Sequence, residues 1–167
     1  MSRVSRTAEL VSLPTTRGSL TFALVPGFDL TVEIARPPED VYAYLTDVSN
    51  LPQWQSSASS AEADGTLREG ARIRERRTFM GREVKTELEV TAHEPGRRFD
   101  LRALSGPIRF EVRHSFEAVG NGTRVRLAVE GEADGMLRFA GPMVARRAER
   151  QFRDDLQRLK QVLESEP

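Results

Sequence analysis

The stretch DLTVEIARPPEDVYAYLTDVSNLPQW, residues 29–54, decides the predicted fold. Leu30, Val32 and Ile34 alternate with polar residues at the two-residue period of a half-buried strand. The two prolines that follow end this strand and preset the backbone for a helix, and the acidic pair after them suits the positive end of that helix. Apolar residues then recur at helical spacing, and a second, very short helix or turn is predicted to carry Trp54 onto the sheet.

The C-terminal stretch GPMVARRAERQFRDDLQRLKQVLESEP, residues 141–167, predicts a long amphipathic helix that starts near Pro142. At ~1.5 Å per residue, such a helix is roughly 35 Å long and can cross a strongly curved sheet. Asp154 and Asp155 point in different directions and are predicted to belong to a solvated helix face. A helical turn over residues 136–140 is expected to precede it. One apolar face of the helix comprises Val144, Ala148, Phe152, Leu156, Leu159 and Leu163.

Between these two stretches, turn residues separate a series of alternating segments. The small polar run at 56–64 suits an exposed edge strand, and Asn121-Gly122 is the strongest short hairpin signal in the chain. Five clearer strands are predicted over residues 71–80, 83–92, 98–104, 108–117 and 123–132. The order is therefore strand, two short helices, six strands and a long helix, which predicts an α+β domain with a seven-stranded antiparallel sheet.

Composition narrows the possibilities further. Lys and Arg together number 25, and so do Asp and Glu, so the chain has no net positive charge that would attract nucleic acid. The chain has no cysteine and no apolar run near the ~20 residues that span a membrane, and no secretory signal is apparent. We expect a cytoplasmic protein without integral membrane association. Residues 1–28 are predicted to form a loosely ordered extension, and residues 29–167 one domain.

The chain resembles the SRPBCC superfamily, which includes the START, Bet v 1 and polyketide cyclase/dehydrase proteins. The resemblance covers about residues 29–165 and implies a helix-grip fold, in which the curved sheet holds the last helix and encloses a cavity. Relatives bind lipids, sterols, polyketides or hormones, and only some are catalysts, so no reaction is implied. The segments that carry the resemblance are residues 32–42, Leu51-Pro52-Gln53-Trp54, Gly70-Ala71-Arg72-Ile73 and residues 156–160.

The alternation of the strands predicts which side chains face the long helix. Most of this interior set simply builds a core. Such a face, apolar with a few polar groups, is typical of a small-molecule site. The predicted apolar interior residues are Ile73, Phe79, Val84, Leu88, Val90, Phe99, Leu101, Ile108, Phe110, Val112, Phe116, Val125, Leu127 and Val129.

Four polar residues share the interior parity, namely Glu75, Arg77, Thr86 and His114. Arg77 has a planar fork of donors that suits a carboxylate or an enolate oxygen, or it pairs with Glu75 instead. His114 can exchange protons near neutral pH, or it is a satisfied structural group. His93 lies beside a predicted turn and is expected to be exposed.

The predicted mouth of the cavity comprises Trp54, Met136, Phe139 and Met143, because flexible and broad apolar side chains adapt to ligands; ordinary packing is the alternative. The candidate ligand-binding residues are thus Trp54, Glu75, Arg77, Phe79, Thr86, Leu88, Phe99, Leu101, Phe110, Val112, His114, Met136, Phe139 and Met143. Catalytic residues are not defined, with His114 and Arg77 as candidates.

Three functions remain open at this point. The first is binding or transport of a small hydrophobic, lipid-like or polyketide-like ligand. The second is a cofactor-free polyketide cyclase, aromatase or dehydratase, in which His114 moves protons and Arg77 stabilises an enolate. The third is a protein-interaction or stress-response regulatory module that uses the outer face of the sheet. No metal-binding or cofactor-binding motif is present, and either a monomer or a homodimer is compatible with the sequence.

Overall fold

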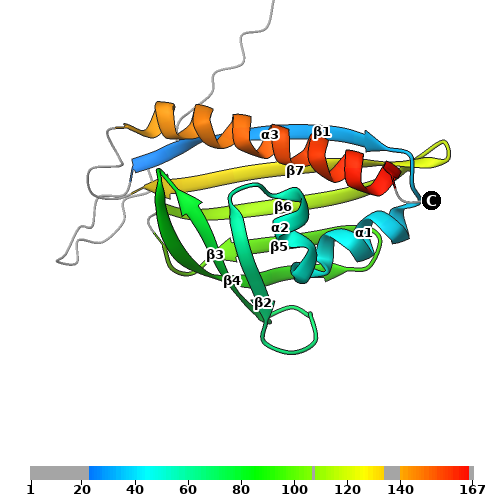
Figure 1. Cartoon of the computed structure of the whole chain (residues 1–167), viewed down its shortest axis with the longest axis horizontal. Helices are drawn as coiled ribbons and strands as arrows, with labels where there is room; N and C mark the ends of the chain where they lie inside the picture. Colours follow the sequence, from blue (N-terminus) through cyan, green and yellow to red (C-terminus); the bar gives the residue numbers. More distant parts are fainter. Residues whose placement is uncertain (1–22, 107, 134–139, 166–167) are drawn as a thin grey trace, which may run out of the picture.

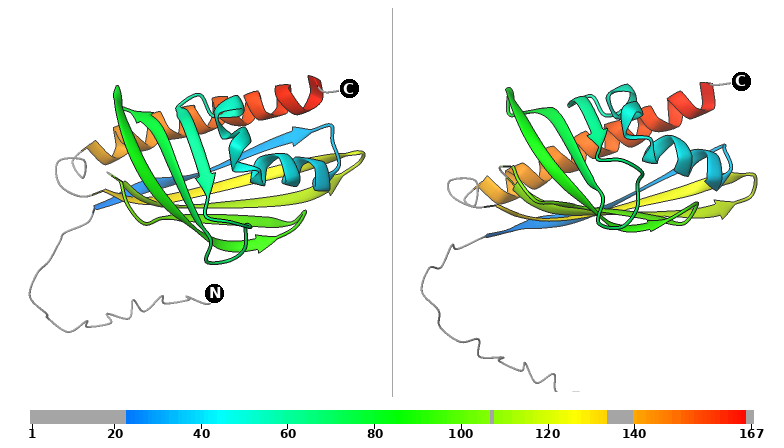
Figure 2. Two further views of the ribbon diagram at one scale, coloured as in Figure 1. Left: turned by 60° about the horizontal axis from the view of Figure 1, so that its bottom comes forward. Right: turned by 90° about the horizontal axis from the view of Figure 1, so that it is seen from below.

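The computed structural model describes residues 23–106, 108–133 and 140–165 of the chain. Its seven strands form one antiparallel sheet in the order β1-β7-β6-β5-β4-β3-β2. The sheet curves, and the helices lie on one side of it (Figures 1 and 2). The elements are β1 (Ala23–Ile34), α1 (Pro38–Thr46), the 3-10 turn η1 (Val48–Asn50), α2 (Leu51–Trp54), β2 (Ala58–Ala63), β3 (Arg72–Phe79), β4 (Arg82–Glu94), β5 (Arg98–Ala103), β6 (Ile108–Val119), β7 (Gly122–Ala133) and α3 (Gly141–Ser165).

The predicted α+β helix-grip class is confirmed by this architecture, and one strand boundary differs from the prediction. Strand β1 begins at Ala23 instead of Asp29, because a register shift between Val25 and Phe28 lets the earlier residues also pair with β7. Gly27 lies in this bulge, where an added Cβ would approach the carbonyl oxygen of the opposite strand to 2.8 Å. The last residues of the predicted extension therefore belong to the sheet.

Helix α1 forms where the prolines predict it. Pro37 precedes the helix, a proline occupies its first turn, and Glu39 and Asp40 lie near its positive end. Val41 and Tyr42 are buried against the sheet, so this short helix covers one end of the concave face.

Helix α3 packs mainly on β1 and α2. Its C-terminal half is also tied to the chain that leads from β1 into α1. Lys160 Nζ donates to the carbonyl oxygen of Glu33 at 2.6 Å, and the backbone N–H of Ala35 donates to Glu164 Oε1 at 2.8 Å. The latter bond holds the pKa of the Glu164 carboxyl below its ordinary value. The helix is therefore fixed at the end of the sheet that α1 covers.

The β6–β7 hairpin forms as predicted, with its turn one residue earlier. Val119 pairs with Gly122, so Gly120 and Asn121 occupy the two central positions and Gly120 has a positive φ of 57°. Gly122 is required for another reason, since an added Cβ would lie 2.5 Å from the carbonyl oxygen of Ile34. The hairpin thus fits closely against the end of β1.

Most of the predicted interior residues form the core. The strands alternate buried and exposed residues, as expected for a sheet with one covered face. Leu156 and Leu159 of α3 complete the core from the helix side. The largest fully buried side chains are Trp54, Phe99, Ile34, Ile73, Leu127, Leu156, Leu159, Val41, Val90 and Val125.

Candidate functional site

An aromatic cluster fills the end of the concave face under α1. Tyr42 of α1 meets Phe116 edge to face at a ring distance of 5.2 Å and lies near Phe99 and His93 at 6.4 and 5.8 Å. Burial, together with the charge of Glu94, raises the pKa of Tyr42 to about 12. His93 is therefore half-buried against aromatic rings, and its predicted exposure is wrong.

His114 lies on β6 beside this cluster, with 4% of its surface exposed. Its Nδ1 is 2.8 Å from the carbonyl oxygen of Phe99 and must donate, because a carbonyl only accepts. Burial lowers the pKa of His114, opposed by that hydrogen bond and by the charge of Asp100. The ring is thus neutral at pH 7, and Nε2 is the nitrogen able to accept a proton or a hydrogen bond.

A second polar group lies on β3, where Glu75 and Arg77 form a bidentate pair with two bonds of 2.7 Å. Glu75 is 2% exposed, while the Arg77 side chain retains 20% of its surface. Arg77 also donates to Gln55 Oε1 at 3.1 Å and to Ser57 Oγ at 3.4 Å. The alternative reading of Arg77 as the partner of Glu75 is therefore the one that the structure shows.

Asp155 of α3 extends this group, contrary to its predicted place on a solvated helix face. It is 3% exposed, and its Oδ1 accepts hydrogen bonds from the backbone N–H of Ser56 at 3.1 Å and from Gln151 Nε2 at 2.9 Å. Burial raises the pKa of Asp155, and these bonds and the charge of Arg77 oppose the rise. We call Gln55, Ser56, Ser57, Glu75, Arg77, Gln151 and Asp155 the polar cluster.

The two candidate catalytic residues are not brought together. His114 is in register with Phe99, which is in register with His93 on β4. Arg77 of β3 is in register with Val84, which also lies on β4 and is nine residues from His93. At ~3.3 Å per residue, this corresponds to roughly 30 Å along β4. His114 belongs to the end under α1, and Arg77 to the opposite end.

The remaining predicted ligand contacts fall into separate groups. Trp54, Leu88 and Val112 are buried, as is Phe99, and Thr86 is buried in register with Glu75. Met143 is 67% exposed, in the first turn of α3, and its place at a cavity mouth stays a prediction. Met136 and Phe139 lie outside the described residues, as does most of the helical turn predicted over residues 136–140.

Several large apolar residues of the interior face keep part of their surface accessible. Leu101 is the clearest, because its neighbours Val90 and Val112 on the adjoining strands are buried while it is only half-buried. Phe28 and Phe152 meet at a ring distance of 5.7 Å between β1 and α3, and both are half-buried. The other half-buried members of this interior set are Phe79, Val84, Ile108 and Phe110.

Two hollows occur on the outer face of the sheet, which the sequence reading did not foresee. The larger, of about 710 Å³, crosses β1, β7, β6 and β5. In it Arg98 donates to Asp100 Oδ2 at 2.8 Å, whereas Oδ1 of Asp100 is buried without a partner among the described residues. The smaller, of about 390 Å³, lies over β2, β3 and β4.

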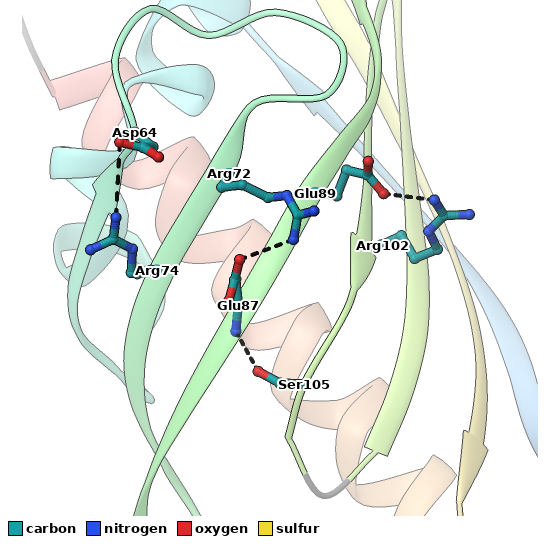
Figure 3. Close-up of polar contacts among 7 residues, drawn as sticks. All are labelled: Asp64, Arg72, Arg74, Glu87, Glu89, Arg102 and Ser105. Carbon is teal, nitrogen blue, oxygen red and sulfur yellow. Dashed lines mark hydrogen bonds and ion pairs between the residues drawn. The ribbon is translucent and has the colours of Figure 1, made fainter.

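The outer face around the smaller hollow is a lattice of ion pairs (Figure 3). Glu87 accepts from Arg72 at 3.0 Å, and Glu89 accepts from Arg102 at 2.6 Å, which holds the pKa of Glu89 below its ordinary value. The backbone N–H of Glu87 donates to Ser105 Oγ at 3.0 Å. Cross-strand pairs of opposite charge stabilise a solvated sheet face, and this accounts for the arginines on this face of the sheet.

Two further findings concern the described residues as a group. No three of their His, Asp and Glu side chains gather in a way that could hold a metal ion. None of the helices in the described ranges is long and apolar enough to cross a membrane.

The curved antiparallel sheet, its concave face lined by apolar and a few buried polar groups, and the long terminal helix define a helix-grip protein. The family model for "polyketide cyclase / dehydrase and lipid transport" matches residues 26–164, and the chain belongs to this family. It thereby falls within the SRPBCC superfamily. No curated protein sequence matches the chain.

Solved structures show the same fold. A START superfamily protein from Mycobacterium smegmatis is 19% identical with a TM-score of 0.73, covering 83% of this chain and 97% of its own. DR_A0006 from Deinococcus radiodurans is 29% identical with a TM-score of 0.60, covering 81% and 95%. The di-domain ARO/CYC protein BexL from the BE-7585A biosynthetic pathway is 20% identical with a TM-score of 0.67, covering 83% of this chain and 46% of its own.

Proposed function

We propose that the protein binds a small hydrophobic, lipid-like or polyketide-like molecule on the concave side of its sheet. The observation that carries the proposal is Leu101, which lies in the middle of the interior face yet keeps accessible surface between buried neighbours. Binding of an apolar ligand is favourable when the ligand covers apolar surface of the concave face that is otherwise in contact with water. The family and the fold both fit such a role.

The buried polar residues give the proposed ligand two different surroundings. At the α1 end, neutral His114 can accept a hydrogen bond at Nε2. At the opposite end, the partly exposed guanidinium of Arg77 can contact a polar group, although its charge is already balanced by Glu75. A mostly apolar molecule with one weakly polar, uncharged end fits these surroundings best.

Native mass spectrometry of protein purified without detergent tests this proposal, because a co-purifying molecule reveals occupancy and chemical class together. The matched variants are Leu101→Trp, which fills the interior face, and Ser115→Trp, which adds the same side chain on the outer face. Binding of anilinonaphthalene sulfonate, an anionic probe whose aromatic rings bind apolar surface, should fall roughly tenfold or more in the first and stay within about twofold in the second. Equal binding by both variants would exclude the concave side as the site.

A second candidate is a cofactor-free cyclase or dehydratase, and the state of His114 favours it. The Nδ1 hydrogen bond to Phe99 fixes the tautomer, so that Nε2 is free to act as a general base at neutral pH. Arg77 cannot share a reacting atom with His114, since the two lie at different ends of the concave face. Turnover that persists in His114→Gln with a substrate found by mass spectrometry would eliminate this candidate.

A further inference from the structure

Two large apolar side chains stand apart from the core. Among the described residues, Met80 and Met143 are the exposed large hydrophobics, with 57% and 67% of their surfaces accessible. Met80 is in the turn between β3 and β4, and Met143 is in the first turn of α3. Figures 1 and 2 show that the β3–β4 turn and the start of α3 lie at the same end of the molecule, opposite α1.

Met80 is not explained by the turn that contains it. Met80 and Gly81 both have positive φ angles, 50° and 77°, as in a tight hairpin turn whose first central position favours Asn or Asp. A methionine side chain in this left-handed conformation is strained, and here it gains no burial in return. The residue thus weakens the turn and leaves an apolar side chain in water.

The exposed face at the start of α3 is equally unusual. Three exposed arginines follow Met143 at three, four and seven positions along the chain, namely Arg146, Arg147 and Arg150. Together with Met143 they form one outward stripe of the helix. The first turn of α3 contains no acidic residue. Arginines near the positive end of a helix oppose its macrodipole, so helix stability does not account for them.

The pairing of these arginines differs from that of the outer sheet face. Within the described part of the chain, Arg146, Arg147 and Arg150 form no ion pair, and neither does Arg82, which follows the β3–β4 turn. On the outer face of the sheet, by contrast, arginines form ion pairs with glutamate and aspartate side chains (Figure 3). We call Met80, Arg82, Met143, Arg146, Arg147 and Arg150 the end surface.

We propose that the end surface docks the protein on an anionic lipid surface. Met80 and Met143 enter the apolar boundary of the lipid layer while the four arginines contact its phosphates. Apolar side chains flanked by unpaired cations are the combination that holds peripheral proteins at such surfaces. Attraction to nucleic acid would account for the arginines but not for two exposed methionines. The contact is weak, reversible and sensitive to salt, and it does not depend on a ligand inside the protein.

Flotation with lipid vesicles tests the charged part of this inference. Vesicles of phosphatidylglycerol and phosphatidylcholine in equal amounts should bind the protein at low salt, and vesicles of phosphatidylcholine alone should not. The variant R146Q/R147Q/R150Q should bind the mixed vesicles roughly tenfold or more weakly. The matched control R74Q/R76Q/R158Q removes the same charge from other faces and should stay within about twofold of the native chain.

Insertion has its own measurement. The fluorescence of M143W should shift to the blue with the mixed vesicles, since the indole leaves water, and M80N should weaken binding although Asn suits the turn better. Circular dichroism checks that every variant is folded. The inference is overturned if the native chain does not bind the mixed vesicles, if the two triple variants lose binding equally, or if the M143W spectrum does not shift. It is also overturned if duplex DNA displaces the vesicles and M80N binds them as well as the native chain does.

Discussion

The two ends of the concave face are built from the same alternating pattern and differ in what covers them. Under α1, Tyr42, Phe99 and Phe116 pack edge to face and are buried. At the other end, Phe79 and Phe110 are only half-buried. Alternation therefore determines which face a side chain joins, whereas the covering helix determines whether that face becomes solid core. Four predictions test this difference.

The largest effect is expected at the polar cluster. Arg77→Met leaves the Glu75 carboxylate buried without its bidentate partner, which should lower the free energy of unfolding by about 3–5 kcal/mol. Urea denaturation followed by circular dichroism measures the change. The double variant Glu75→Leu/Arg77→Met removes both charges and should recover most of the loss. If the single and double variants are equally unstable, the pair is not what holds this end together.

The next prediction compares the two ends with one kind of change. Phe99→Ala should cost about 3–5 kcal/mol, because a fully buried ring under α1 leaves a cavity. Phe110→Ala should cost about 1–2 kcal/mol, since the ring is already partly in contact with solvent. Urea midpoints measured under the same conditions give the ratio. Equal costs would mean that the two ends are packed alike.

A smaller effect is expected where α3 crosses the polar cluster. Asp155→Ala leaves the backbone N–H of Ser56 without its acceptor and should cost about 1–3 kcal/mol. Asp155→Asn keeps an acceptor oxygen and removes a buried charge. Because burial raises the pKa of Asp155, the folded protein binds its proton more tightly than the unfolded chain, and ionisation of this carboxyl as pH rises lowers stability. Asp155→Asn should thus equal or exceed the native stability at pH 7.

The smallest effect depends on pH at the end under α1. Burial lowers the pKa of His114, so the unfolded chain takes up a proton first as pH falls below about 6.5. Stability due to the neutral ring is complete above this pH and is lost as pH falls towards the folded pKa. Denaturant midpoints measured from pH 7 to 5 should fall less steeply in His114→Gln. His93→Gln is the control, and an identical slope in both variants would contradict the assignment.

The fold could be predicted because it depends on local patterns. The prolines before α1, the apolar stripe of α3 and the alternation of the strands each leave a direct trace in the sequence. The start of β1 could not, because Pro26 and Gly27 are typical of a loop and only their pairing with β7 across a bulge makes them part of a strand. Long-range pairing overrides local preference at this point.

The candidate site could be predicted only in part. Parity correctly placed Glu75, Arg77 and His114 on the interior face, since this requires only a two-residue period. It could not show that Asp155 of α3 and the loop at Ser56 join them, because those contacts depend on how the helix lies against α2 and the loop after it. The distance between the two candidate catalytic residues likewise depends on sheet register, which one sequence does not specify.

The pairing of β1 with β7 has a consequence for how the protein is made. These strands are at opposite ends of the chain order and adjacent in the sheet, and α3 then packs on β1. Among the strands that the structure describes, β1 pairs with β7 alone, so these hydrogen bonds cannot form until β7 has left the ribosome. Contacts so distant in sequence slow folding. During synthesis, β1 therefore stays unpaired until its partner residues are made, 89 to 110 positions later in the chain.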